Sequence, residues 1–386
     1  MNALSLQIDL TIYRQILRDD VIVAYGTSDF IPLLIERAHN LGLSGNIFRQ
    51  YLIHTFLYDE NIFSISCENG EDIEGSGLYD YAMDDIHTLQ LLCDLDVQAP
   101  TDYRSISAVT DPVVELLEKA LTAEEKMRLL IGCYKTRGAG SLARFHMFSV
   151  NEDGSMRGIR HYDKISFEQI IGCGWQKEAL RVNTEAFLAG KPVNNVLLVG
   201  SRGSGKSSCV KALVNQYHDK GLRLVEVQRG QLLPGLIEKL AARGKHFIIF
   251  MDDLSYGQFE TEYKYLKSLL EGGAETRPDN ILFYATSNRR HIVTESWNDR
   301  NSDDELHIND TINEKMSLSD RFGLTLLFPH INQEEYLRIV TVLAAKHGIN
   351  IDTETLHAKA LQWSVEHKRM SGRSAAQFLR CLEGEL

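Results

Sequence analysis

The spacing of hydrophobic and polar positions changes near residue 160. Before that point, apolar residues recur at intervals of three or four, which predicts helices. We expect helices at residues 13–23, 29–41, 47–57, 112–121 and 123–134. The last of these follows Thr122, with Glu125 three positions further on, which is the spacing of a capping box. Residues 144–150 and 155–159 are predicted strands, because the NEDG sequence between them is typical of a turn.

After residue 165, short apolar runs alternate with helical patterns. The predicted strands are 195–199, 222–227, 246–251, 280–286 and 325–328, and helices are expected at 206–217 and 263–270. Such alternation predicts a parallel sheet covered on both faces. Three further helices are expected at 333–347, 353–367 and 373–383. We therefore predict a mainly helical N-terminal domain at 1–160, an α/β core at 161–330 and a C-terminal helical domain at 331–386.

A glycine-rich loop, GSRGSGKS at 200–207, lies between the first strand of this core and a helix. Its glycines permit backbone angles that turn successive N–H groups inward, where they can surround a phosphate. Lys206 would supply positive charge to the β- and γ-phosphates, and the Ser207 hydroxyl would ligate Mg²⁺. The residues expected to hold the nucleotide here are Gly200, Ser201, Arg202, Gly203, Ser204, Gly205, Lys206, Ser207 and Ser208.

Two later strands end in polar residues that belong to the same chemistry. Asp252 and Asp253 follow a buried strand, IIFM, and we expect Asp252 to hold Mg²⁺ and Asp253 to orient or deprotonate the attacking water. Asn288, with Ser287 as the alternative, follows the next strand and can reach the γ-phosphate or the water. The plainer alternatives are that the acids form a turn and that Asn288 caps one.

Two arginines further along the chain complete the set of candidates. Arg321, in SLSDRFG, could act across a subunit boundary on the γ-phosphoryl group, or it could form a surface pair with Asp320. Arg373, in SGRS, opens the last helix, where a cation is opposed by the helix dipole. Contact with bound nucleotide is one role for Arg373, and a salt bridge is the other.

These elements, in this order, resemble those of the AAA+ ATPase superfamily. GSRGSGKS and IIFMDD are similar to its Walker A and Walker B motifs, TSN ending at Asn288 to sensor 1, LSDRFG to the arginine-finger segment, and GRS around Arg373 to sensor 2. The segment FEQIIGCGWQKEAL resembles the wall of the adenine pocket and makes Ile170 and Ile171 candidate contacts. Several stretches, among them YATSNRRHI and SGRSAAQF, also resemble a bacterial family of predicted AAA+ ATPases catalogued as a domain of unknown function.

The resemblance implies a P-loop NTPase fold with a parallel-sheet core and a C-terminal helical lid, together with ATP and Mg²⁺ as cofactors. It also implies a homo-oligomer, a ring or an arc, in which Arg321 reaches the neighbouring subunit. One departure is that AAA+ proteins usually carry Glu where this chain has Asp253. Since Asp is one methylene shorter, hydrolysis could be slow.

Charge is spread unevenly along the chain, whose net charge is −12. Residues 51–100 hold eleven acidic side chains and no Lys or Arg. This stretch is either a solvated surface or a docking face for a basic protein partner. It repels phosphate backbones, so composition does not support strong nonspecific binding to nucleic acid, although nucleic acid stays open as a partner.

No apolar run is long enough for a membrane span, and the first residues lack a secretory pattern, so a cytoplasmic protein is expected. The six cysteines lie far apart without metal-binding spacing.

Two functions from different classes fit this sequence. The first is an oligomeric AAA+ ATPase that couples Mg-dependent ATP hydrolysis to the remodelling of a macromolecule. The second is a slow-turnover adaptor or loader whose ATP state controls partner docking, with the acidic N-terminal domain as the docking part. A P-loop small-molecule kinase is a weaker third, since such an enzyme needs neither an Arg321 finger nor an Arg373 lid helix.

Overall fold

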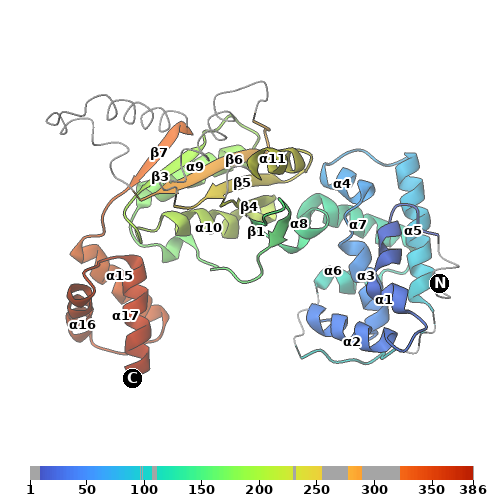
Figure 1. The fold of residues 1–386 in the computed structure, drawn as a ribbon, viewed down its shortest axis with the longest axis horizontal. Helices are drawn as coiled ribbons and strands as arrows, with labels where there is room; N and C mark the ends of the chain where they lie inside the picture. Colours follow the sequence, from blue (N-terminus) through green and yellow to red (C-terminus); the bar gives the residue numbers. More distant parts are fainter. Residues whose placement is uncertain are drawn as a thin grey trace. The chain divides into compact units, whose positions relative to one another are not determined.

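The computed structural model describes residues 9–95, 97, 99–106, 111–228, 232–253, 277–288 and 322–385 (Figure 1). The chain falls into two compact units. One comprises Met1–His146 with Arg243–Lys245, and the other comprises Met147–Ala242 with His246–Leu386. Among the described residues, no helix has the length and apolar character needed to cross a membrane.

The first unit is helical. A 3-10 helix, η1 (Arg14–Arg18), is followed by α1 (Asp20–Ala24), α2 (Phe30–Leu41), α3 (Ile47–Leu57), α4 (Ile62–Glu68), α5 (Gly77–Cys93), α6 (Pro112–Lys119), α7 (Ala123–Arg137) and α8 (Ser141–Arg144). Its core contains the stacked rings of Tyr13 and Phe56, whose centroids are 4.5 Å apart. The Tyr134 hydroxyl donates to the Phe56 carbonyl oxygen over 2.8 Å, which satisfies a buried polar group. The capping box between Thr122 and Glu125 is present at the start of α7, as predicted.

The prediction of one continuous helix over residues 13–23 is wrong. Asp19 has an extended backbone, with φ −62° and ψ 135°, and separates η1 from α1. Its carboxylate accepts hydrogen bonds from the backbone N–H groups of Val21 and Ile22, so it caps a new helix instead of continuing the old one. The helices α4 and α5, which lie in the acidic stretch, were not among the predicted elements.

The second unit contains a seven-stranded sheet in the order β2-β1-β4-β5-β6-β3-β7. The strands are β1 (Met147–Val150), β2 (Met156–Gly158), β3 (Val196–Gly200), β4 (Leu222–Glu226), β5 (His246–Met251), β6 (Ile281–Ser287) and β7 (Leu324–Phe328). All neighbouring strands are parallel except the β1–β2 hairpin. The five core strands therefore lie where the apolar runs predict them.

Helices cover both faces of this sheet (Figure 1). A 3-10 helix, η2 (Phe167–Gln169), leads into α9 (Gly174–Leu188), and α10 (Lys206–Tyr217) follows β3. Residues of α9 and α10 share one core with Val196 and Leu198. The alternate residues Leu197 and Val199 are buried on the opposite face. Another 3-10 helix, η3 (His218–Lys220), precedes β4, and α11 (Leu233–Ala241) precedes β5 and contacts β6. Because β3, β5 and β6 are buried on both faces, their sequences are almost continuously apolar.

Three helices close the chain, as predicted: α15 (Gln333–Lys346), α16 (Thr353–Glu366) and α17 (Gly372–Glu385). They pack around their own core, which includes Tyr336, Val340 and Phe378. We refer to α15–α17 as the lid.

The β1–β2 hairpin was placed in the N-terminal domain by the predicted boundary at residue 160. In the structure the first unit ends at His146, because β1 pairs in parallel with β4 through Met147, Phe148 and Ser149. The predicted helix at 263–270 lies outside the described residues.

Candidate nucleotide site

The candidate site is built where three neighbouring strands end at the same edge of the sheet. In the order β5-β6-β3, the strand β6 lies between the other two. β3 runs into the glycine-rich loop, β5 into Asp252 and Asp253, and β6 into Asn288. Because the carboxyl ends of parallel strands meet at one edge, residues up to 82 positions apart in the sequence come within hydrogen-bond distance.

The loop itself has the backbone that its glycines favour. Gly203 and Gly205 have φ values of +79° and +96°, which side-chain-bearing residues rarely adopt. The helix α10 begins at Lys206, directly after the loop, so its free N–H groups face the loop. The Ser204 hydroxyl is buried and has no hydrogen-bond partner among the described residues.

Lys206 is the centre of a small hydrogen-bond network. Its buried ammonium donates to the carbonyl oxygens of Gly200 and Ser201 over 2.7 and 2.8 Å. It also donates to Asn288 Oδ1 over 3.0 Å. Burial lowers the pKa of Lys206, and the charges of Asp252 and Asp253 oppose that shift. The structure thus brings the predicted lysine and the predicted β6 residue into direct contact.

Ser207 and Asp252, the predicted magnesium ligands, are also adjacent. The Ser207 hydroxyl donates to Asp252 Oδ1 over 2.7 Å, and the Thr286 hydroxyl donates to the same oxygen over 2.6 Å. The described residues contain no group of three or more His, Cys, Asp or Glu side chains that could hold a metal by themselves. A Mg²⁺ ion here would therefore be held by Ser207 and Asp252 with phosphate and water oxygens, which suits its preference for few protein ligands.

Asp253 is held by three groups. Its Oδ2 accepts from Arg202 Nη2 over 2.9 Å, and its Oδ1 accepts from Asn288 Nδ2. Its backbone N–H donates to the Thr286 hydroxyl over 2.8 Å, and its φ of +58° lies in the left-handed region. Thr286 therefore contacts both acids, although the residues predicted from the sequence at this strand end are Asn288 and, as the alternative, Ser287. Ser287 is buried in the sheet, and its position in a fully buried strand end was a signal against it.

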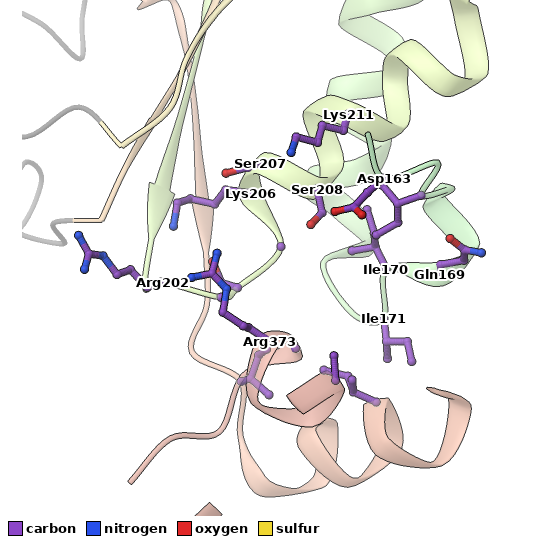
Figure 2. A pocket seen from close by; sticks show the side chains of 18 of the residues that line it. Asp163, Gln169, Ile170, Ile171, Arg202, Lys206, Ser207, Ser208, Lys211 and Arg373 are labelled. Atoms are coloured by element: carbon purple, nitrogen blue, oxygen red, sulfur yellow. The ribbon is translucent and has the colours of Figure 1, made fainter. Parts of the chain in front are cut away.

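A cavity of about 870 Å³ extends from these residues to the lid. That volume is in the range of pockets that bind small molecules. Ile170 and Ile171 line it, as do Arg373 and several lid residues (Figure 2). Ile170 is 7% exposed, and Ile171 packs against the core of the lid. Both isoleucines thus lie where a base-binding wall is expected.

The cavity also contains charged side chains that the motifs did not indicate. Lys211 and Arg380 line it together with Arg202, Lys206 and Arg373, whereas the acidic lining residues are Asp163, Asp252 and Asp253. Five cations against three carboxylates favour a polyanionic ligand. Lys211 could have been found from its position one helical turn after Ser207. The lining therefore fits a nucleoside triphosphate with Mg²⁺, and Arg321, the remaining candidate, lies outside the described residues.

Residues 142–386 match the family described as "Protein of unknown function (DUF815)". The chain belongs to this family. The match spans the sheet, the glycine-rich loop and the lid, and it confirms the expected membership in a family catalogued as a domain of unknown function. The parallel core, glycine-rich loop and helical lid of this DUF815 member have the architecture predicted from the sequence, a parallel-sheet α/β core followed by a C-terminal helical lid.

Several solved structures are similar to this DUF815 member. The RuvB Holliday junction branch migration motor of Thermotoga maritima matches with a TM-score of 0.36 and 14% identity, over 56% of this chain and 72% of that one. PCH-2 of C. elegans matches with a TM-score of 0.37 and 18% identity, over 55% and 63% of the two chains. Scores below 0.5 indicate nothing about substrate or partner. No curated protein matches the chain.

Proposed function

We propose that this protein is a Mg-dependent AAA+ ATPase that works as an oligomer and couples its nucleotide state to the remodelling of a macromolecule. The observation that carries the proposal is the convergence of three strand ends on one cavity. There the Lys206 ammonium, the Ser207–Asp252 pair and the Asn288–Asp253 pair are joined by hydrogen bonds.

Each residue then has a role set by its position. Lys206 and the N–H groups of the loop bind the phosphates, and Ser207 with Asp252 holds the metal, which would neutralise charge on the phosphate oxygens. Asn288 orients the attacking water, and Asp253 accepts the proton that the water loses. Ile170, Ile171 and Arg373 hold the base and phosphate from the lid side.

ATP binding and phosphate release test this assignment. Lys206→Ala should abolish both, because the buried ammonium is central to the network. Lys191→Ala removes an exposed lysine at the end of α9 and serves as the charge-matched control. ATP binding by the Lys206→Ala variant at wild-type affinity would contradict the proposed site.

A second candidate function, the slow-turnover adaptor or loader, is favoured by one observation. Both oxygens of the Asp253 carboxylate are occupied by protein donors, so the residue is restrained as a base. The two functions differ in basal turnover: fast hydrolysis without a partner counts against the adaptor.

Capture of partners on an Asp253→Asn variant with ATP tests docking in either case. The Lys206→Ala/Asp253→Asn double variant is the control, since it retains the carboxylate change and loses ATP. A partner retained equally by both variants does not depend on the nucleotide.

A further inference from the structure

Arg202 lies in the middle of the glycine-rich loop, and its side chain contacts Asp253, which follows another strand. Its guanidinium Nη2 lies 2.9 Å from Asp253 Oδ2. The two side chains are 71% and 45% exposed. If Arg202 served only to bind phosphate, its guanidinium would be free to contact the ligand. Instead, the Asp253 carboxylate of the same protein holds it.

The other contacts of Asp253 restrict how its carboxylate can move. Its backbone N–H is fixed on the Thr286 hydroxyl, and its φ is +58°. Non-glycine residues adopt this region uncommonly, and here the hydrogen bond to Thr286 holds the backbone in it. The backbone is therefore anchored, and a change of the base's direction has to come from the side chain alone.

The side chain is held from two directions. Arg202 binds one carboxylate oxygen and the Asn288 amide binds the other. Asn288 in turn accepts a hydrogen bond from Lys206. Hydrogen bonds therefore connect Arg202, Asp253, Asn288 and Lys206 in a row across the phosphate site. The glycine-rich loop that carries Arg202 is itself held in place, because the Gly203 carbonyl oxygen accepts a hydrogen bond from the Gly372 N–H of the lid over 3.3 Å.

Hydrolysis joins the oxygen of the attacking water to the γ-phosphorus, breaks the bond to the β–γ bridging oxygen and requires a base for the water's proton. Asp253 can be that base only if a lone pair of its carboxylate faces the water. A guanidinium donating to that oxygen competes with the water for it. Removal of this cation leaves the carboxylate tethered by Asn288 alone.

We propose that Arg202 is a positioning residue that restrains hydrolysis by holding the Asp253 carboxylate away from the attacking water. The inference rests on the proposed ATPase function. It assigns the slow step of the cycle to a contact within the subunit that has to break, with ATP bound, before Asp253 can accept the proton of the water.

The test is steady-state hydrolysis by an Arg202→Gln variant, with kcat and KM measured separately at saturating Mg²⁺. We expect kcat to rise about two- to fivefold, the factor to which an exposed ion pair converts. Arg202→Lys keeps a cation without the planar fork and should give a kcat between the two. If Arg202 served phosphate binding alone, KM would rise and kcat would stay or fall, which would overturn the inference.

A double variant shows whether the effect passes through Asp253. Arg202→Gln/Asp253→Asn should be as slow as Asp253→Asn, because the restraint has no base left to act on. Faster turnover in the double variant than in Asp253→Asn would contradict the inference. Arg157→Gln, a change of the same type at an exposed position of β2, is the control for charge.

ATP binding separates this inference from the function on which it rests. A wild-type protein that binds no ATP overturns both. A wild-type protein that binds ATP, with no faster turnover in Arg202→Gln, overturns the inference alone. Thermal unfolding of each variant shows that the exposed substitution leaves the fold intact.

Discussion

At the scale of single residues, His54 gives the helical unit a dependence on pH. Its ring lies 4.6 Å from that of Tyr58, centroid to centroid. Burial lowers the pKa of His54 to about 3; the Arg144 charge adds to this shift, and Asp111 opposes it. In the unfolded chain the residue titrates near its ordinary value of about 6.5. Between these pH values the unfolded chain binds a proton that the folded chain does not, so stability falls as pH falls from about 6.5 to about 3.

His54→Phe should therefore flatten the acid limb of the stability curve. Between pH 7 and pH 4.5 the wild type should lose about 2–3 kcal/mol more than the variant, since one pH unit of this linkage is worth about 1.4 kcal/mol. Urea unfolding followed by circular dichroism at the two pH values measures this difference. His39→Phe, at an exposed position of α2, should keep the wild-type dependence. Equal losses in wild type and His54→Phe would exclude the role of His54.

At the scale of elements, α5 holds the backbone of residues 11–13 through one buried carboxylate. Asp85 accepts from the backbone N–H groups of Thr11, Ile12 and Tyr13 over 2.9, 2.7 and 2.9 Å. It is 1% exposed. Asp85→Ala should destabilise the helical unit by about 3 kcal/mol, because three backbone donors, of which that of Tyr13 is buried, lose a charged acceptor. Asp84→Ala, on the exposed side of the same helix, should change stability by less than about 0.5 kcal/mol. Similar unfolding midpoints for the two variants would contradict this account.

The contact between the loop and the lid gives a second prediction for elements. A Cβ on Gly203 would lie 2.8 Å from Ser371 Cβ and 2.9 Å from its Oγ, at a φ of +79°. Gly190, with φ +67° and open space around it, carries the strain without the clash. Thermal unfolding should therefore show a larger loss of stability for Gly203→Ala than for Gly190→Ala. The Gly190→Ala variant measures the backbone strain alone, which is about 1 kcal/mol. Equal losses of stability in the two variants would contradict a close contact between Gly203 and Ser371.

Sequence alone predicted elements wherever periodicity was strong. The strands β3, β5 and β6 are almost continuously apolar because both of their faces are buried, and the three lid helices carry regular apolar positions. The helix α5 was not predicted because acidic side chains interrupt its apolar positions, and one of them, Asp85, is buried for a reason that only the folded chain shows. Similarly, motif spacing located Lys206, Asp252 and Asn288, but the Arg202–Asp253 contact joins residues 51 positions apart and depends on strand order.

At the scale of the whole molecule, the proposed assembly makes hydrolysis a property of the oligomer. Arg321→Ala should lower turnover by about a thousandfold or more, the effect of losing an arginine finger, without loss of folding. Arg338→Ala, at an exposed position of the lid, is the control. Turnover is measured as a function of protein concentration together with sedimentation in ATP. Wild-type activity in Arg321→Ala would remove this arginine from the mechanism.

The β1–β2 hairpin determines where the protein can be cut. Since β1 supplies the hydrogen-bond partners of β4, a chain shortened to begin at residue 160 would leave β4 as an unpaired parallel strand at the edge of the sheet. Such a fragment should pair with other copies of itself and precipitate. A fragment that begins before Met147 keeps the short, three-residue β2 as its outer strand, which offers little to a neighbouring copy. The hairpin therefore protects the edge of β4 from pairing with another copy of the protein, in addition to extending the sheet.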